Sequence, residues 1–497
     1  MFESAELGHK VDKETYNKEV PALRAALLDA QFDLREAAKF PVVILIGGVD
    51  GAGKGEAVNQ LNEWMDPRTI QTHAVRQASE EDRERPPMYR FWKILPPKGR
   101  IGIFFGSWYT DPILGRVYGK MKASAFDARI DEINKFERML TDEGTVLLKL
   151  WFHLSKKQQK ERLKALASNS KTRWRVTDHD WEHFSLYDDF RRVSEHTVTT
   201  TSTGAAPWLV IEGADHRYRS LTTGTAVLQA IRRRLDAPAS AAPAATEIPA
   251  LPVAPAVDKL NLLKALDMML ALPKKEYELE LWKQQRQLAL LARRPAFNRR
   301  SVVVVFEGSD AAGKGGAIRR VTRGLDARQY EVIPIAAPSD EERAQPYLWR
   351  FWRHVPRHGS FTIFDRSWYG RVLVERVEGF CPQADWMRAY HEINDFEALL
   401  ANYGVIVVKF WLQITKDEQL RRFEERAKID FKHHKITDED WRNREKWDQY
   451  ETAVGDMIDR TSTKHAPWTI VEANDKFHAR VKVIRTLHDQ IEAALAE

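Results

Sequence analysis

Residues 302–315 read VVVVFEGSDAAGKG, an unbroken apolar run followed directly by a glycine-rich loop. Apolar runs of this length that are rich in β-branched residues are typical of strands buried on both faces of a parallel sheet. The sequence after Lys314 is competent to form a helix, so the stretch predicts a strand, a tight loop and a helix in succession. Units of this kind indicate the α/β class of folds.

The loop in this stretch has the composition of a phosphate-binding loop. Glycines let the backbone turn tightly and aim its N–H groups at phosphate oxygens, and the start of the next helix adds a partial positive charge. The alternative is a plain turn between a strand and a helix. We predict phosphate contacts from Gly308, Ala311, Ala312, Gly313, Lys314 and Gly315.

The loop departs from the usual pattern at its last position. A serine or threonine normally follows the lysine and ligates magnesium, whereas Gly315 follows Lys314 here. Metal ligands must then come from elsewhere, and Asp310 and Asp365 are the candidates, because Asp365 ends the predicted strand 361–364. Mg²⁺ needs only one or two carboxylates besides phosphate oxygens. We expect Mg²⁺, with Mn²⁺ as the alternative ion, and the competing interpretation of Asp365 is a helix cap.

Basic residues gather around these acids. Arginine pairs with phosphate oxygens and can neutralise a transferring phosphoryl group. Any single arginine is more simply a surface residue, but the set favours a polyanionic substrate. The set is Arg366 and Arg371, with Glu375 nearby, and upstream Arg343 and Arg350.

A basic segment, residues 428–436, contains Lys432 and Lys435 and has no apolar stripe. It predicts either a lid that closes over phosphates or a solvated loop.

The chain is a tandem repeat. A shift of 260 residues carries Asp50 onto Asp310 and Lys54 onto Lys314, and the same shift relates motifs as far apart as residues 90–92 and 206–208 to their second copies. A period of this size is a whole domain. The Ala- and Pro-rich stretch 236–258 reads as a linker. We therefore predict domains 1–235 and 259–497.

Within each half, strands such as 405–411 alternate with polar, helix-competent stretches such as 386–402. This alternation predicts a three-layer α/β/α sandwich with a parallel sheet, duplicated in tandem.

The two halves differ at the predicted metal site. At the same shift, Asp365-Arg366 corresponds to Phe105-Gly106, and Arg371 and Glu375 correspond to Asp111 and Gly115. Phosphoryl transfer depends on positioning and on neutralised charge, so a half without the strand-end acid is expected to be inactive. We predict that the second half is catalytic, and that the first half keeps a phosphate-binding cleft or serves as a docking partner.

The composition limits the classes of partner, metal site and cellular location that the protein can have. The 497 residues carry 77 Lys+Arg against 71 Asp+Glu, a net charge of +6, which favours anionic partners. The one cysteine excludes a thiolate metal cluster and fits a reducing compartment. The apolar runs are far shorter than the roughly 18–20 residues of a membrane helix, and no secretory signal opens the chain. We expect a cytoplasmic protein with no membrane partner.

These motifs resemble the polyphosphate kinase 2 family of P-loop phosphotransferases. The resemblance rests on Gly308-x-Asp310-Ala-Ala-Gly313-Lys314-Gly315, on Phe364-Asp365-Arg366-Ser367-Trp368-Tyr369, on Thr415 and on the basic segment, and it covers nearly the whole chain except the linker. Asp310 and Lys314 match the family's first motif, Asp365 and Arg366 its second, and residues 428–435 its lid.

The resemblance, which is to the two-domain class II branch of the family, implies a nucleotide-kinase-like fold. It also implies Mg²⁺-dependent transfer of the terminal phosphoryl group of inorganic polyphosphate to AMP, which gives ADP. The expected catalytic residues are Asp310, Lys314, Asp365, Arg366, Arg371 and Glu375. The expected assembly is a homo-oligomer, a dimer of fused chains.

Two alternatives stay open. The first is a polyphosphate- or ATP-dependent kinase for other nucleoside mono- or diphosphates, which the phosphate loop alone does not exclude. The second is a non-catalytic binder of polyphosphate or nucleic acid. We expect no nucleic-acid partner, because basic residues interleaved with aromatics along one surface are only weakly present.

Overall fold

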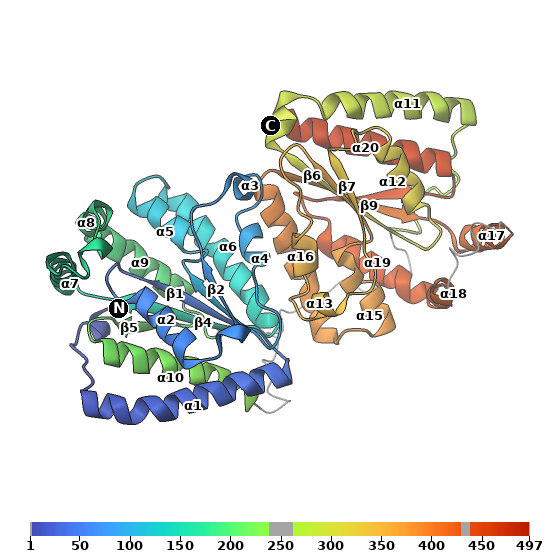
Figure 1. The fold of residues 1–497 in the computed structure, drawn as a ribbon. Helices are drawn as coiled ribbons and strands as arrows, with labels where there is room; N and C mark the ends of the chain where they lie inside the picture. The colour runs from blue at the N-terminus through green and yellow to red at the C-terminus, as the bar shows by residue number, and fades with distance from the viewer. Residues whose placement is uncertain (1, 238–261, 429–437, 497) are drawn as a thin grey trace. The chain divides into compact units, whose positions relative to one another are not determined.

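Two five-stranded parallel sheets organise the computed structural model, which describes residues 2–237, 262–428 and 438–496 (Figure 1). The strand order is β2-β3-β1-β4-β5 in the first sheet and β7-β8-β6-β9-β10 in the second, so the two sheets have the same topology. Neighbouring strands run parallel throughout the described part of both sheets. The predicted α/β class and its duplication are confirmed.

The strands of the first sheet are β1 (Val42–Gly48), β2 (Ile70–Ala74), β3 (Ile101–Phe105), β4 (Val146–His153) and β5 (Trp208–Glu212). Those of the second sheet are β6 (Ser301–Gly308), β7 (Tyr330–Pro334), β8 (Phe361–Asp365), β9 (Val405–Gln413) and β10 (Trp468–Glu472).

Helices cover both faces of each sheet, which makes three layers (Figure 1). In the first half, one face carries α1 (Lys13–Ala37), α2 (Lys54–Trp64) and α10 (His216–Leu235), and the other carries α5 (Thr110–Val117), α6 (Ala123–Asp142) and α9 (Tyr187–Thr201). In the second half, the corresponding groups are α11 (Lys274–Leu291), α12 (Lys314–Thr322) and α20 (Lys476–Ala496), and α15 (Val374–Glu378), α16 (Gln383–Asn402) and α19 (Trp447–Thr461).

Further α-helices lie in the connections between these elements. They are α3 (Glu80–Arg83), α4 (Tyr89–Trp92), α7 (Lys156–Ser168), α8 (Asp178–Ser185), α13 (Asp340–Arg343), α14 (Trp349–Trp352), α17 (Lys416–Ala427) and α18 (Asp438–Glu445).

The central strands are apolar because helices cover them on both sides. In β6, the side chains of residues 302–306 are all buried, and the core they form includes residues of β8, β9, α12 and α20. All strands run parallel, so their carboxyl ends meet at one edge of each sheet, which is where α/β proteins bind ligands. The loops after β6 and β8 therefore come together at that edge.

A buried ion pair recurs under this edge in both halves. Lys409 of β9 lies 2.7 Å from Glu397 of α16, and Lys149 of β4 lies 2.7 Å from Glu137 of α6. Lys409 also donates to the Thr461 carbonyl and to the Tyr369 hydroxyl, and that hydroxyl donates to Glu397. The tyrosine of the Ser-Trp-Tyr string thus belongs to the core, where every polar atom of the cluster gains a partner.

The chain divides into two compact units. Unit 1 comprises Met1–Ala78, Arg90–Ala244 and Ser339–Trp349, and unit 2 comprises Ser79–Tyr89, Ala245–Pro338 and Arg350–Glu497. Each unit thus takes in a short segment from the other half of the sequence. The domain bounds 1–235 and 259–497, with a linker at 236–258, stay a prediction.

Among the helices that the structure describes, none combines the length and the apolar character that crossing a membrane requires.

Candidate functional site

The loop after β6 adopts a conformation that its small residues permit. Gly308 approaches β9 so closely that a Cβ there would lie 2.6 Å from the Leu412 carbonyl oxygen. Ala311 and Gly313 have φ angles of 63° and 109°, in the left-handed region, and α12 begins at Lys314. The loop Gly308, Asp310, Ala311, Ala312, Gly313, Lys314 and Gly315 therefore lies between a buried strand and a helix N-terminus, as phosphate-binding loops do.

Lys314 folds back over this loop. Its Nζ donates to the carbonyl oxygen of Gly308 at 2.6 Å, and the side chain is only partly buried. The ammonium group is thus held at the mouth of the loop, where it can meet a phosphate oxygen.

Asp365 and Arg366 end the neighbouring strand. Asp365 is the last residue of β8 and pairs in register with Phe306 of β6, so it lies at the same sheet edge as the loop. Arg366 has a φ of 65°, a conformation that non-glycine residues rarely adopt. The equivalent Gly106 has a φ of 80°, so the turn is shared while the side chain is present in one half only.

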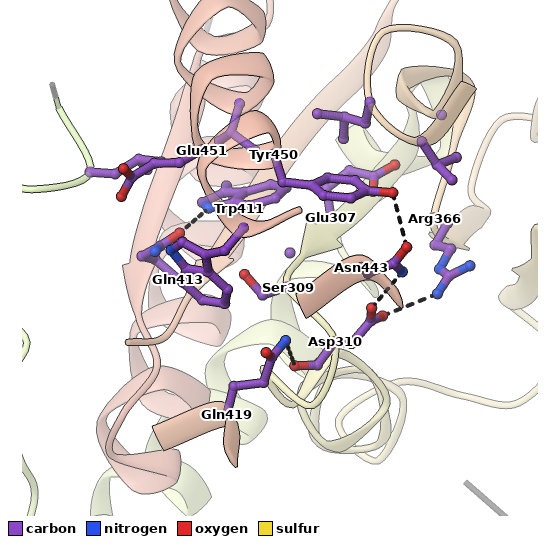
Figure 2. A pocket seen from close by; sticks show the side chains of 17 residues that line it. Glu307, Ser309, Asp310, Arg366, Trp411, Gln413, Gln419, Asn443, Tyr450 and Glu451 are labelled. Carbon is purple, nitrogen blue, oxygen red and sulfur yellow. Dashed lines mark hydrogen bonds and ion pairs between the residues drawn. The ribbon is translucent and has the colours of Figure 1, made fainter. Parts of the chain in front are cut away.

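Asp310 is the centre of a hydrogen-bonded group (Figure 2). Its Oδ1 lies 3.2 Å from Nη2 of Arg366, and its Oδ2 accepts from Nδ2 of Asn443 at 2.8 Å. Asn443 in turn accepts from the Tyr450 hydroxyl at 3.1 Å, and Gln419 donates to the Asp310 carbonyl. The acid of the loop is therefore oriented by side chains from four other segments.

These residues surround a cavity of about 100 Å³. Gly308, Asp310 and Arg366 form its polar side, and the opposite walls are largely aromatic and aliphatic. Those walls include Trp411, Trp447, Tyr450, Val454 and Leu263. A polar end beside an apolar wall is the usual composition of a site for a phosphorylated organic molecule.

Glu307 is a site residue that the sequence analysis did not identify. Its side chain is buried, lines the cavity, and accepts a hydrogen bond from Oγ of Ser367 at 2.8 Å. Burial raises the pKa of this carboxyl group, and the Ser367 hydrogen bond and the charge of Lys314 offset only part of that rise. A comparison of the two halves could have identified Glu307, because the shift of 260 residues places Gly47 at the equivalent position of the first half.

Arg422 of α17 is a second residue that was missed. Its guanidinium is 2% exposed and donates to the carbonyl oxygens of Ala311 at 2.9 Å and Ala312 at 3.0 Å. It also donates to Ala473 and Asn474 after β10. The arginine thus braces the phosphate loop from behind. No comparison of the halves could identify it, because Arg162 occupies the equivalent position.

The other arginines predicted for the site have partners outside the phosphate loop. Arg371 pairs with Glu375 at 3.0 Å and lies 3.8 Å from Asp385. Arg343 lies 3.4 Å from Asp340 and belongs to a segment grouped with unit 1, whereas the loop belongs to unit 2. Arg350 donates to the Ala336 carbonyl. Among the predicted arginines, Arg366 is the one that pairs directly with a residue of the loop.

The predicted lid, residues 428–436 with Lys432 and Lys435, lies outside the described residues except for Lys428.

The first half has the same loop but lacks the acid and the arginine that end the neighbouring strand in the second half. Lys54 donates to the Gly48 carbonyl at 2.6 Å, as Lys314 does to Gly308. Asp50 pairs with Lys54 at 3.2 Å and with His183, which replaces Asn443, at 2.8 Å. Burial raises the pKa of Asp50, but Lys54 and His183 outweigh burial and hold that pKa well below its usual range.

The donor atoms of the second half suit a hard divalent cation. The described residues contain no cluster of three His, Cys, Asp or Glu side chains that could hold a metal. Asp310 and Asp365 supply carboxylate oxygens at one sheet edge, without thiols or imidazoles. Two carboxylates supplemented by phosphate oxygens and water are what Mg²⁺ requires. In the first half, Phe105 occupies the place of the strand-end acid.

Known proteins resemble this chain over its full length. A protein named polyphosphate:AMP phosphotransferase from Pseudomonas aeruginosa is 58% identical over 494 residues, which is 99% of each chain. One of the same name from Pseudomonas syringae pv. tomato is 53% identical over 496 residues, 100% of this chain and 99% of its own. A crystal structure from Pseudomonas aeruginosa PA01, described as a polyphosphate kinase 2, superposes with a TM-score of 0.90 at 56% identity over the whole of both chains.

A family model matches both halves separately. The model described as Polyphosphate kinase 2 covers residues 10–237 and again residues 271–497. Each match includes one complete sheet with its phosphate loop. The chain therefore belongs to the polyphosphate kinase 2 family, with two copies of the family's fold in one polypeptide.

Proposed function

We propose that this protein is a kinase that transfers the terminal phosphoryl group of inorganic polyphosphate to AMP, giving ADP, at the site in its second half. The full-length relatives named polyphosphate:AMP phosphotransferase support the reaction and the acceptor. The observation that carries the choice of site is the pairing of Asp310 with Arg366 beside Asp365, a constellation for which the first half has Phe105 and Gly106.

The reaction needs no side-chain nucleophile. An oxygen of the AMP phosphate attacks the terminal phosphorus of polyphosphate, and the bond from that phosphorus to the bridging oxygen breaks as the shortened chain leaves. Catalysis of this step consists of alignment and charge neutralisation. Lys314 and the loop amides hold phosphate oxygens, and Arg366 faces the same space from the neighbouring strand.

Asp310 and Asp365 would hold a divalent cation, Mg²⁺ or Mn²⁺. The bound cation neutralises charge on the phosphate oxygens and helps to align them. Arg366 and Asn443 already orient both carboxylate oxygens of Asp310, so a ligand role for Asp310 requires one of these contacts to yield. Asp365 is the more available donor at the sheet edge.

The other predicted residues keep their expected roles as proposals. Arg371 with Glu375, together with Arg350, would bind the polyphosphate chain farther from the reacting phosphorus. The roles of Arg343, Lys432 and Lys435 in binding phosphate stay predictions. The cytoplasmic location, the homo-oligomer of fused chains and the absence of a nucleic-acid partner also stay predictions. Light scattering on the purified chain would test the assembly.

The duplicated loops supply a matched experiment. Lys314→Ala should lower turnover about 100-fold or more, because it removes a charge that acts on the transferring phosphoryl group. Lys54→Ala should leave most turnover intact. The assay supplies polyphosphate, Mg²⁺ and AMP, ADP, GMP or GDP in separate reactions and identifies each product. Equal losses from the two variants would reject the choice of site, and activity with ATP alone as donor would reject polyphosphate as the donor.

A further inference from the structure

We propose that the cleft of the first half is a second, non-catalytic site that binds an anionic phosphate group without a divalent cation. A nucleoside phosphate and a polyphosphate chain present the same chemistry to this site, and the experiment below distinguishes these two sources of the phosphate. This site is separate from the catalytic site proposed above, because all the residues that line it belong to unit 1.

The anion-binding part of the cleft is intact. Gly48 has a φ of 129°, and a Cβ there would lie 2.0 Å from the Phe152 carbonyl oxygen, so the loop approaches β4 as its counterpart approaches β9. Gly51 and Gly53 have left-handed φ angles of 79° and 85°, and α2 begins at Lys54. The backbone and the lysine therefore repeat the geometry of the second loop.

A buried arginine packs against this loop too, but it comes from a different helix. Arg219 of α10 is 3% exposed, donates to the Gly213 carbonyl at 2.8 Å, and pairs with Glu56 of α2. Its guanidinium lies against Gly53, where a Cβ would come within 2.2 Å of it. In the second half, Ala479 occupies the equivalent position and Arg422 acts as the brace. Burying a charge is costly unless it is paired, and Glu56 provides that partner for Arg219. The arginine beside the loop therefore comes from a different helix in each half.

The cavity beside the loop is larger than its counterpart. It measures about 470 Å³, against about 100 Å³ in the second half. Glu307 and Arg366 line the smaller cavity, and the equivalent residues of the first half are Gly47 and Gly106. The larger cavity therefore lacks these two side chains. Lys54 and Asp50 lie at one end, and aromatic side chains including Tyr118, Trp151 and Phe190 line the walls. This volume falls within the usual range for small-molecule sites, roughly 300–1,000 Å³.

The charges in the cleft favour an anion without a metal. Phe105 removes the second carboxylate, which leaves Asp50 as the acid of the loop. Asp50 is already paired with two bases, Lys54 at 3.2 Å and His183 at 2.8 Å. Arg76 adds another cationic side chain to the lining. A phosphate entering this space meets an acid that is already neutralised and does not require a cation to offset it.

The test is equilibrium binding to the full chain in buffer that contains EDTA. Titration calorimetry with AMP and, separately, with tripolyphosphate identifies which source of phosphate the cleft accepts, and adenosine is the control without phosphate. Wild-type protein and Lys314→Ala should bind with similar affinity at the first-half site. Lys54→Ala should weaken that binding by about 10-fold or more, as expected for the loss of a charged hydrogen bond.

Lys54→Gln provides a second variant that removes the positive charge but keeps a side-chain hydrogen-bond donor, and thermal melting of each variant checks that the fold is retained. Metal-free binding that Lys54→Ala and Lys54→Gln both leave unchanged would overturn the proposal, and so would its complete loss in Lys314→Ala. A wild-type protein that binds neither ligand in EDTA would also overturn it. Turnover plays no part in the readout, so the result does not depend on the catalytic assignment.

Discussion

Nη2 of Arg366 lies 3.2 Å from Oδ1 of Asp310, although 56 positions separate the two residues. The arginine reaches the loop acid from a backbone conformation with a φ of 65°. Left-handed backbone in a residue other than glycine costs of order 1 kcal/mol or more and tends to persist at functional sites. The pair therefore joins a strained strand end to the phosphate loop.

Replacing Arg366 should separate activity from stability. Arg366→Gly removes the charge and relieves the left-handed strain, so kcat should fall about 100-fold or more while the melting temperature is unchanged or higher. Arg366→Ala should lose as much activity but melt at a lower temperature than the glycine variant. Steady-state kinetics and thermal melting provide the measurements. Full activity in Arg366→Gly would contradict the role assigned to the guanidinium.

Glu307→Gln should stabilise the protein at neutral pH. Burial raises the pKa of Glu307, so its contribution to stability is complete below the pKa of an unfolded glutamate and is lost as pH rises through the raised value. Glutamine can still accept the hydrogen bond of Ser367 but carries no buried charge. The difference in melting temperature between the variant and the wild type should be near zero in acid and grow with pH. A variant less stable than the wild type at neutral pH would contradict this expectation.

Lys409→Met should destabilise the second unit by about 3–5 kcal/mol, because it leaves the Glu397 carboxylate buried without its charge partner. The double variant Lys409→Met, Glu397→Leu should recover much of that loss. Urea unfolding followed by tryptophan fluorescence measures both effects. Lys149→Met, with Glu137 as its partner, is the matched change in the first unit. A single variant as stable as the double one would show that the pair is not coupled.

His183 should titrate above an ordinary histidine. Its hydrogen bond with Asp50 raises the pKa of the imidazole, and partial burial opposes that shift. The pair therefore stabilises the first unit at low pH, and the contribution is lost as pH rises through the raised pKa. NMR titration of the imidazole protons should show a midpoint above 6.5 in the wild type and a lower one in Asp50→Asn. Equal midpoints would mean that the two groups are not coupled.

Arg422→Lys should lower kcat/KM for polyphosphate by about 10-fold, because one ammonium cannot replace a guanidinium that donates both to the Ala311 carbonyl in the loop and to the Ala473 carbonyl after β10. Arg162→Lys is the matched control, since its side chain is 40% exposed and should tolerate the change. Kinetics with varied polyphosphate at saturating AMP measure the effect. Equal activity in the two variants would contradict the brace.

The fold followed from local pattern. All residues of the run 302–306 are apolar, as expected for a strand that helices cover on both faces of the sheet. The glycine-rich loop after it indicates a tight turn into a helix. The duplication was visible because the two copies share their order of motifs with few insertions. The loss of the strand-end acid at Phe105 was visible for the same reason, since the second half provides the reference. The strand, the loop, the duplication and the missing acid can all be recognised from the order of residues along the chain.

The hydrogen-bond partners of the site residues could not be predicted from the sequence. Asn443 and Asp310 are 133 positions apart, and Arg422 and Ala311 are 111 apart. Nothing in residue order indicates that α18 supplies an amide to the loop acid, or that one of many arginines is the buried brace. Likewise, Lys409 was visible within an apolar strand, but its partner Glu397 was not.

By itself, the sequence determined the class of fold, its duplication, the phosphate loops and the asymmetry between the halves, because each is written in consecutive residues or in their repetition. Only the tertiary structure decided how Asp310 is held, that Glu307 is buried beside it, and that a different arginine braces each loop. Those arrangements arise where side chains from distant segments must satisfy one another's charges and hydrogen bonds away from water, and this requirement acts in space rather than along the chain.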